Sequence, residues 1–192
     1  MSEASIIARL DRELESKGFA RRRSTWNRAH DSLVDVIDIQ VSKGGDTVTL
    51  NAGILSRPVY RAVWGRDAGD FVEEPFCTIR VRVGQLLGNK DRWWSVSESR
   101  SDDELAECTH SHVLPFLDRV GTLEEMRNWL ATNGIPSPKL PLASLCLAVL
   151  QSQLGDLTGA CKLLAVIEDK ALGNWKNRAR EVAVRIGCPP RN

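Results

Sequence analysis

The chain has 192 residues, with 26 Lys/Arg against 25 Asp/Glu and a net charge of +1. The charges are also even along the chain, since residues 1–95 hold 15 Lys/Arg and 13 Asp/Glu and the remainder 11 and 12. This balance argues against a global basic field for nucleic acid or an anionic membrane. The length allows a buried core without metal or disulfide staples, so small-scaffold classes are excluded.

The cysteines and the start of the chain indicate a compartment. An odd number of widely spaced cysteines without a C-x-x-C pair favours reduced thiols. Charged residues at positions 9, 11 and 12 interrupt any apolar run of signal-peptide length, and the apolar stretch 142–150 is too short to cross a bilayer. We therefore expect a cytoplasmic protein that makes no membrane contact and carries no cofactor. Its cysteines are Cys77, Cys108, Cys146, Cys161 and Cys188.

The first predicted elements are a helix and a charged strand. Apolar residues at positions 6, 7, 10 and 14 predict an amphipathic helix from a Ser2 cap to Gly18. A strand over residues 20–28 follows, and its four arginines are typical of a sheet edge. We expect these arginines to meet Asp35 or Asp38 on the neighbouring strand.

Residues 34–54 predict a β-hairpin with a defined register. Apolar and polar residues alternate on both sides of Gly44-Gly45, which favours a two-residue turn there. That turn sets position 41 against 48, 39 against 50 and 37 against 52, all on one apolar face. A slip of one residue would oppose apolar and polar side chains throughout. The opposite face is polar and carries Asp38, Gln40, Thr49 and Asn51.

Residues 55–76 are predicted to be a long loop with one short strand at 59–63. The loop contains Tyr60, Arg61, Trp64 and Arg66, the amphipathic mixture that protein interfaces favour. The alternative is that Trp64 folds back over a small core. Loops of this length are often functional, so we take these four residues as candidate binding residues.

Two more strands complete the predicted sheet. Residues 77–83 alternate, with Arg80 and Arg82 on a basic side that can adjoin the polar hairpin face. Residues 92–96 predict a short last strand that carries Arg92, Trp93 and Trp94. The fold class is therefore α+β, with an antiparallel sheet of about four to five strands after an N-terminal helix, then a helical segment.

Helix signals dominate from residue 101 onward. Ser101 with Glu104, and Thr122 with Glu125, have capping-box spacing. Pro115 is expected to end or kink the first of these helices, and Gly134 to stop the second.

The domain organisation follows from these signals. We expect an α+β domain over residues 1–134, a linker over 135–140 and a helical extension over 141–192 that packs on the first domain. The turn Leu154-Gly155-Asp156-Leu157 resembles that of a tetratricopeptide repeat, but a single unit is not a stable solenoid.

Several motifs together resemble the bacterial domain-of-unknown-function 4304 family, over about residues 6–130. They include Lys17-Gly18-Phe19, then Trp26, and the paired runs 36–42 and 47–54. Further along they are Arg82-Val83-Gly84-Gln85-Leu86, Asp91-x-Trp93-Trp94 and Leu114-Pro115-Phe116-Leu117-Asp118 before Leu123-Glu124-Glu125. The resemblance implies an α+β bacterial domain. It brings no catalytic motif, so it leaves the activity open.

Candidate chemistry is sparse. Glu104, Cys108 and His112 share a helix face with His110 beside them, but a tetrahedral zinc site needs a further ligand pair, so we expect no metal. Residues 84–91 lack the glycine spacing and the Ser/Thr of a phosphate loop. The polar hairpin face with Arg80 and Arg82 is either a hydrogen-bonded surface, which we favour, or the pocket of an enzyme with a perturbed acid.

Three functions remain open. The leading hypothesis is a non-enzymatic protein-binding module of the cytoplasm, with an immunity-like, toxin-neutralising role as one form of it; residues 55–76 would supply contacts. The first alternative is nucleic-acid binding through Arg21–Arg23 with Trp26, and Arg92 with Trp93 and Trp94. The second is an enzyme that uses Asp38 with Arg80 or Arg82.

Overall fold

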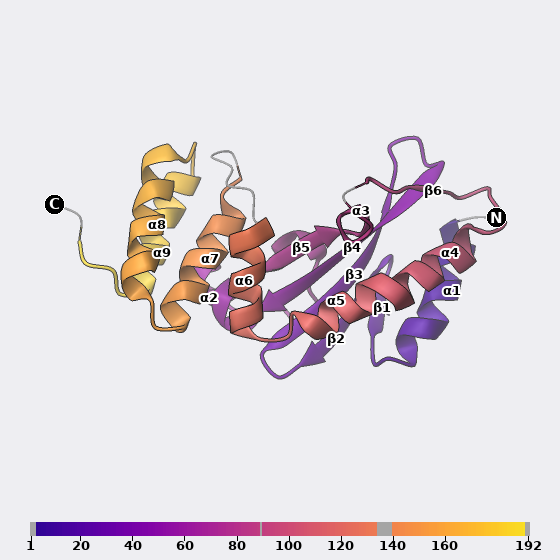
Figure 1. Ribbon diagram of the computed structural model, residues 1–192, viewed down its shortest axis with the longest axis horizontal. Coiled ribbons are helices and arrows are strands. Elements are labelled where there is room, and N and C mark those ends of the chain that lie inside the picture. The colour runs from indigo at the N-terminus through magenta and orange to yellow at the C-terminus, as the bar shows by residue number, and fades with distance from the viewer. Residues whose placement is uncertain (1–2, 89, 134–139, 191–192) are drawn as a thin grey trace. The chain divides into compact units, whose positions relative to one another are not determined.

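The computed structural model describes residues 3–88, 90–133 and 140–190, which fall into two compact units. Unit 1 comprises Met1–Leu55 and Asp70–Arg119, and unit 2 comprises Ser56–Gly69 and Val120–Asn192. The α+β class is confirmed: an N-terminal helix precedes an antiparallel sheet, and helices follow it (Figure 1). The predicted linker at 135–140 falls almost wholly on residues outside the described ranges, as does Gly134, so both stay predictions.

The sheet of unit 1 has strand order β1-β2-β3-β4-β5, and β6 also pairs with β4. Neighbouring strands with a recorded register are antiparallel. The strands are β1 (Ala20–Arg22), β2 (Thr25–His30), β3 (Leu33–Val41), β4 (Thr47–Ser56), β5 (Ile79–Arg82) and β6 (Trp94–Ser95). The single strand predicted over residues 20–28 is therefore wrong, because a turn at Arg23, which has a positive φ of 56°, divides it in two.

The central hairpin forms as β3 and β4, with its apolar face in the core. Ile37, Ile39, Leu50 and Ala52 are all buried. The amide of Ser42 donates to the carbonyl of Thr47 at 2.8 Å, which agrees with the predicted register. The connection is longer than the two-residue turn we expected. Only the second of the two glycines has a positive φ, and its amide donates to the Ser42 carbonyl, so residues 43–46 all belong to the loop.

A buried carboxylate joins the sheet to a helix of unit 1. Asp35 on β3 is 1 % exposed, and its Oδ2 lies 2.8 Å from Arg28 Nη2 on β2. The same nitrogen lies 2.8 Å from Oδ1 of Asp118 on helix α5 (Leu114–Arg119), and the guanidinium covers the ring of Phe19. His30 Nε2 approaches Asp35 Oδ2 at 3.1 Å. The expected contact between a β2 arginine and a neighbouring carboxylate is thus confirmed for Asp35.

Helix α1 (Glu3–Glu15) buries Ile6, Leu10 and Leu14, as its spacing predicted. The helix is also hydrogen-bonded to the sheet, because Asp11 accepts a 2.8 Å hydrogen bond from the indole of the fully buried Trp26 on β2. The other helices of unit 1 are α3 (Val83–Leu86), α4 (Ser101–Cys108) and α5 (Leu114–Arg119), with a 3-10 turn at Glu74–Phe76.

Pro115 neither ends the helix that contains it nor leaves it regular. A π-helical turn, Thr109–Val113, connects α4 to α5, and the Leu114 amide donates to the carbonyl of Thr109. Because proline lacks the amide proton and its ring crowds the preceding turn, a widened turn just before it lets the helix continue.

Unit 2 is helical: α2 (Arg57–Trp64), α6 (Leu123–Asn133), α7 (Leu142–Gln153), α8 (Leu157–Lys170) and α9 (Trp175–Arg185). The loop with a short strand that we predicted over residues 55–76 is wrong at α2. Ser56 caps this helix by accepting from the amide of Val59, Pro58 stands in its first turn, and Gly65 ends it with φ of 70°. None of the helices in the described residues is long and apolar enough to span a membrane.

Of the two predicted capping boxes, one forms. Thr122 and Glu125 satisfy each other's amides at 3.0 and 3.2 Å, which confirms the start of α6. The box at Ser101 is wrong. Its hydroxyl donates to the carbonyl of Ser95 at 2.7 Å, and the Glu104 carboxylate is held by side chains from another segment.

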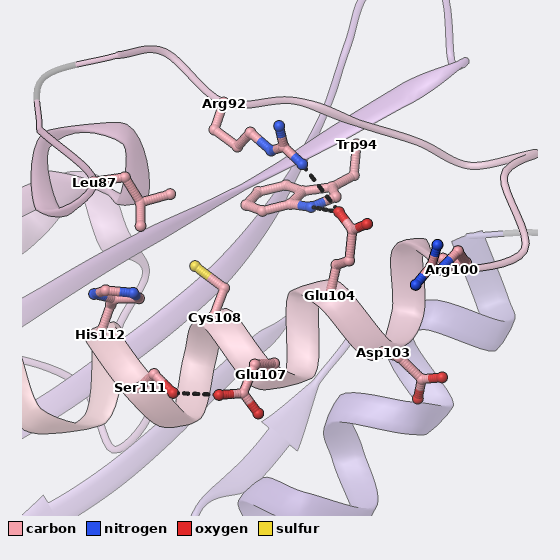
Figure 2. A pocket seen from close by; sticks show the side chains of 10 residues that line it. All are labelled: Leu87, Arg92, Trp94, Arg100, Asp103, Glu104, Glu107, Cys108, Ser111 and His112. Carbon is pink, nitrogen blue, oxygen red and sulfur yellow. Dashed lines mark hydrogen bonds and ion pairs between the residues drawn. The ribbon is translucent and has the colours of Figure 1, made fainter.

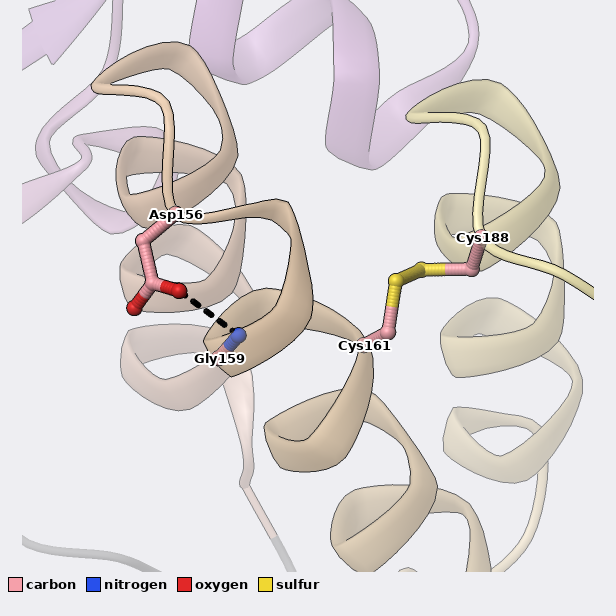
Figure 3. Close-up of a disulfide and its surroundings, with 4 residues drawn as sticks. All are labelled: Asp156, Gly159, Cys161 and Cys188. Carbon is pink, nitrogen blue, oxygen red and sulfur yellow. Dashed lines mark hydrogen bonds between the residues drawn. A yellow bond between two sulfur atoms is a disulfide. The ribbon is translucent and has the colours of Figure 1, made fainter.

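Cys161 on α8 and Cys188 after α9 form a disulfide (Figure 3). Our expectation of five reduced thiols is therefore wrong for this pair, because the α8–α9 hairpin brings together residues 27 positions apart. Cys77, Cys108 and Cys146 are buried and are not part of a disulfide.

Arg28→Ala should strongly destabilise unit 1. The substitution leaves the buried Asp35 carboxylate without its arginine, and breaking a buried pair in this way costs roughly 3 kcal/mol. Urea unfolding followed by circular dichroism measures the change. Arg12→Ala, at an exposed residue of α1, is the control and should stay within about 0.5 kcal/mol of wild type. Equal midpoints for the two variants would refute the role of Arg28.

Reduction of the disulfide should destabilise unit 2. Its loop spans 27 residues, for which chain entropy gives about 3.5 kcal/mol. Thermal unfolding with and without dithiothreitol measures the effect. Cys161→Ser should match the reduced wild type and should not respond to the reductant. An unchanged melting curve, with full reduction verified by mass spectrometry, would contradict this expectation.

Candidate binding cleft on helix α4

An open cleft of about 630 Å³ runs along helix α4 in unit 1. The segment before and within β6 supplies Arg92 and Trp94, and the end of α3 supplies Leu87. Helix α4 supplies one wall (Figure 2). The lining residues are Leu87, Arg92, Trp94, Arg100, Asp103, Glu104, Glu107, Cys108, Ser111 and His112. Arg92 and Trp94, both predicted from sequence as candidate binding residues, therefore meet in one cavity.

Glu104 fixes the geometry of one end of the cleft. Its Oε2 accepts from Trp94 Nε1 at 3.1 Å and from Arg92 Nη2 at 2.9 Å. The Arg92 guanidinium also lies over the Trp94 ring, 5.2 Å from its centroid. The backbone is held as well, because Trp94 pairs with Val48 on β4. Trp94 is 5 % exposed, and its indole cannot turn away without breaking these contacts.

The middle of the cleft is apolar. The Cys108 thiol points into the space between Leu87, His112 and the Trp94 ring (Figure 2). Burial raises the pKa of this thiol to about 11, with Arg92 opposing the shift and Glu107 adding to it. At neutral pH the group is therefore a protonated thiol, which is a poor nucleophile.

The three residues that the sequence suggested as possible metal ligands all line this cleft. Glu104, Cys108 and His112 lie along one face of the helix, as their spacing predicted. Over residues 3–88, 90–133 and 140–190, however, no group of three His, Cys, Asp or Glu side chains could hold a metal ion. Glu104 instead serves Arg92 and Trp94.

The polar sheet face is a closed hydrogen-bond network centred on Arg82. This side chain donates to Gln40 Oε1 at 2.9 Å and to Asn51 Oδ1 at 3.4 Å, and it pairs with Asp91 at 3.5 Å. It also lies over the ring of Trp93, whose indole donates to Asp91 at 2.9 Å. The structure therefore places Trp93 with Arg82, on the sheet face, and not in the cleft with Trp94.

The remaining members of that face are also engaged. Arg80 makes two 2.9 Å hydrogen bonds to the buried Glu74, and Thr49 donates to the carbonyl of Arg92 at 2.8 Å. Asp38 accepts from Thr25 Oγ1 at 2.7 Å. Burial raises the pKa of Asp38, and the hydrogen bond from Thr25 partly opposes that shift. The perturbed acid that an enzyme would need is present here, but both arginines are committed to carboxylates.

The candidates from residues 55–76 belong to unit 2. Tyr60 is 7 % exposed on the buried side of α2, while Arg61 and Arg66 are exposed. The Trp64 ring lies 6.1 Å from that of Trp175, so this tryptophan folds back onto its own unit, as in the alternative to a binding loop.

Three of the four cationic residues proposed for nucleic acid in unit 1 have partners of their own. Arg21 pairs with Asp11 at 3.0 Å, Arg22 lies over the ring of Phe71, and Arg92 is held by Glu104. Nucleic-acid phosphates would have to compete with Asp11 for Arg21 and with Glu104 for Arg92.

Sequence reasoning missed Leu87 and the role of Glu104. The available signal was the spacing of Glu104, Cys108 and His112, which placed three polar side chains on one helix face. That spacing alone raises only the possibility of a metal site. The aromatic partner of that face comes from another segment, so spacing alone could not supply it.

Comparison with known proteins adds one finding. The family model described as Domain of unknown function (DUF4304) matches residues 10–119, a range that contains every residue of the cleft. No curated protein and no solved structure matches the chain.

The Cys108 thiol should react slowly with iodoacetamide at neutral pH. With a pKa of about 11, its thiolate fraction at pH 8 is about a hundredfold below that of an ordinary thiol. The rate should therefore rise about tenfold per pH unit up to pH 10. Peptide mapping by mass spectrometry resolves this cysteine from the others, with glutathione as the reference thiol. A rate that levels off below pH 9 would contradict the raised pKa.

Proposed function

We propose a function for this chain, which belongs to the family described as Domain of unknown function (DUF4304). It is a non-enzymatic protein-binding module that holds a segment of its partner in the α4 cleft. One observation carries the proposal. The cleft combines an apolar floor at Leu87, Trp94 and Cys108 with a charged rim whose orientation is fixed by Glu104.

The composition of the cleft suits a polypeptide ligand. Tryptophan and arginine are enriched where proteins bind each other, and binding energy concentrates in preformed pockets of this kind. Because Trp94 and Arg92 are already held in place, little conformational entropy is lost when a partner side chain enters. An apolar side chain of the partner would contact the floor of the cleft, while the partner's backbone or a neighbouring polar side chain would contact the charged rim.

The same residues argue against nucleophilic catalysis in this cleft. The Cys108 pKa of about 11 keeps the sulfur protonated, and Glu104 is occupied by two donors. A thiol next to His112 could suggest a Cys/His pair, but such a pair needs a depressed thiol pKa. Binding without chemistry is the function that these groups support best.

An immunity-like role is one form of this proposal, in which the bound segment belongs to a toxin and binding blocks its action. The cleft would then act by occlusion, because an open groove can cover an extended segment of another protein. We propose this role for the cytoplasm of a bacterium, where the Cys161–Cys188 disulfide would have to persist against cellular reductants.

Leu87→Glu should weaken peptide binding in the cleft. The probe is a set of peptides selected from a random phage-displayed library, synthesised with a fluorophore and measured by fluorescence anisotropy. A carboxylate on the apolar floor must be desolvated when the peptide binds, which we expect to weaken affinity by about tenfold or more.

Leu86→Glu is the matched control, since this neighbour is also half-buried but does not line the cleft. It should bind as wild type does. Failure of the library to yield any peptide that distinguishes the two variants would refute the proposal.

A further inference from the structure

The two units carry opposite charge. Unit 1 contains 14 Lys/Arg and 18 Asp/Glu, whereas unit 2 contains 12 and 7. The charge counts for residues 1–95 and 96–192 do not show this difference, because unit 2 includes residues 56–69 from the first half of the chain. The even charge that argued against a polyanion ligand therefore does not describe unit 2, which has a net charge of +5.

Part of this charge gathers where α2 packs on α9. Arg185 on α9 donates to the carbonyls of Ala62 and Val63 at 3.1 Å each, so it satisfies the C-terminal end of α2. Its guanidinium lies so close to Gly65 that a Cβ there would be 2.7 Å from Nη2. The next residue, Arg66, is exposed and therefore adds its charge beside this contact.

Two tryptophans lie in the same place. Trp64 at the end of α2 and Trp175 at the start of α9 have ring centroids 6.1 Å apart, and both are half-buried. The Arg178 guanidinium lies 5.1 Å from the centroid of Trp64. Lys176, next to Trp175, is exposed. We call these residues the α2–α9 face: Trp64, Arg66, Trp175, Lys176, Arg178 and Arg185.

The acidic partners do not balance the face. Arg178 Nη1 and Arg185 Nη2 converge on a single oxygen, Oε2 of Glu181, at 2.8 and 3.0 Å. One carboxylate thus serves two guanidiniums. Within the described ranges neither Arg66 nor Lys176 forms an ion pair, and Asp67, next to Arg66, pairs with Arg61 at 3.5 Å. Converging guanidiniums beside aromatic rings are the groups that bind phosphate and stack on bases.

We propose that the α2–α9 face binds single-stranded nucleic acid, with phosphates on its cations and a base on the exposed part of a tryptophan ring. A single strand fits better than a duplex because its bases are free to stack on a side chain, whereas bases inside a duplex are already stacked. This site is separate from the α4 cleft, and it does not include Arg21–Arg23 or Trp93/Trp94, the residues that the sequence suggested.

The test measures fluorescence anisotropy of fluorescein-labelled dT20 with the full chain, from 20 to 200 mM NaCl. If about three phosphates are neutralised, affinity should fall on the order of tenfold between 50 and 200 mM NaCl. Arg66→Glu/Lys176→Glu should weaken binding by at least tenfold at 50 mM NaCl. Both residues are exposed, so folding should be unaffected.

Arg12→Glu/Lys43→Glu makes the same change of charge at exposed sites of unit 1 and should leave the affinity within about twofold of wild type. Equal loss in both double variants would show non-specific attraction to the whole chain and would overturn the proposal. So would the absence of any dT20 binding at 20 mM NaCl.

Trp64→Ala tests stacking, with circular dichroism to check the fold and Trp175→Phe as a variant that keeps a ring. Loss of one stacked base should weaken dT20 binding on the order of tenfold, while Trp175→Phe should retain most of it. Heparin, which has charge but no bases, should not respond to Trp64→Ala. If heparin and dT20 bind with the same affinity in every variant, the face attracts polyanions only and the proposal fails.

Discussion

The buried carboxylate of Asp35 sets a constraint that the rest of unit 1 must meet. A charge removed from water needs a positive partner, and Arg28 on the neighbouring strand supplies it. The other carboxyl oxygen, Oδ1, has no hydrogen-bond partner among the described residues, so the ion pair is the main compensation. Because Arg28 also reaches Asp118 on α5, the same interaction holds a helix to the sheet. That helix continues from α4, which bears the cleft.

A second polar contact places the cleft itself. One oxygen of Glu104 accepts hydrogen bonds from the indole of Trp94 and the guanidinium of Arg92. These two bonds join α4 to the segment that leads into β6. The π-helical turn after Cys108 accommodates Pro115 and allows α4 and α5 to act as one element between the two contacts. Cleft geometry thus depends on two carboxylates, one deep at Asp35 and one at the surface.

Local rules predicted the parts of the fold in which neighbours in sequence are neighbours in space. The hairpin alternation gave the buried face of β3 and β4, and the cap at Thr122 forms as expected. At residues 57–64 the loop prediction fails because Pro58 and Gly65 occur in loops but also, together with Ser56, start and stop a helix. At Ser101 the capping spacing was real, but Trp94 and Arg92 compete for Glu104. The disulfide and the charge difference between the units depend on contacts that spacing does not show.

Helix α2 links the family-matched region to the helical unit. It lies within residues 10–119, yet its contacts are with α7 and α9 in unit 2. Its buried side, Val59, Tyr60 and Val63, belongs to that core, and Arg185 from α9 satisfies its last carbonyls. A segment limited to residues 10–119 would leave these apolar side chains and carbonyls without the helices that cover them. The residues that cover the buried side of α2 therefore lie outside the matched region, and the helices after residue 119 help to stabilise α2.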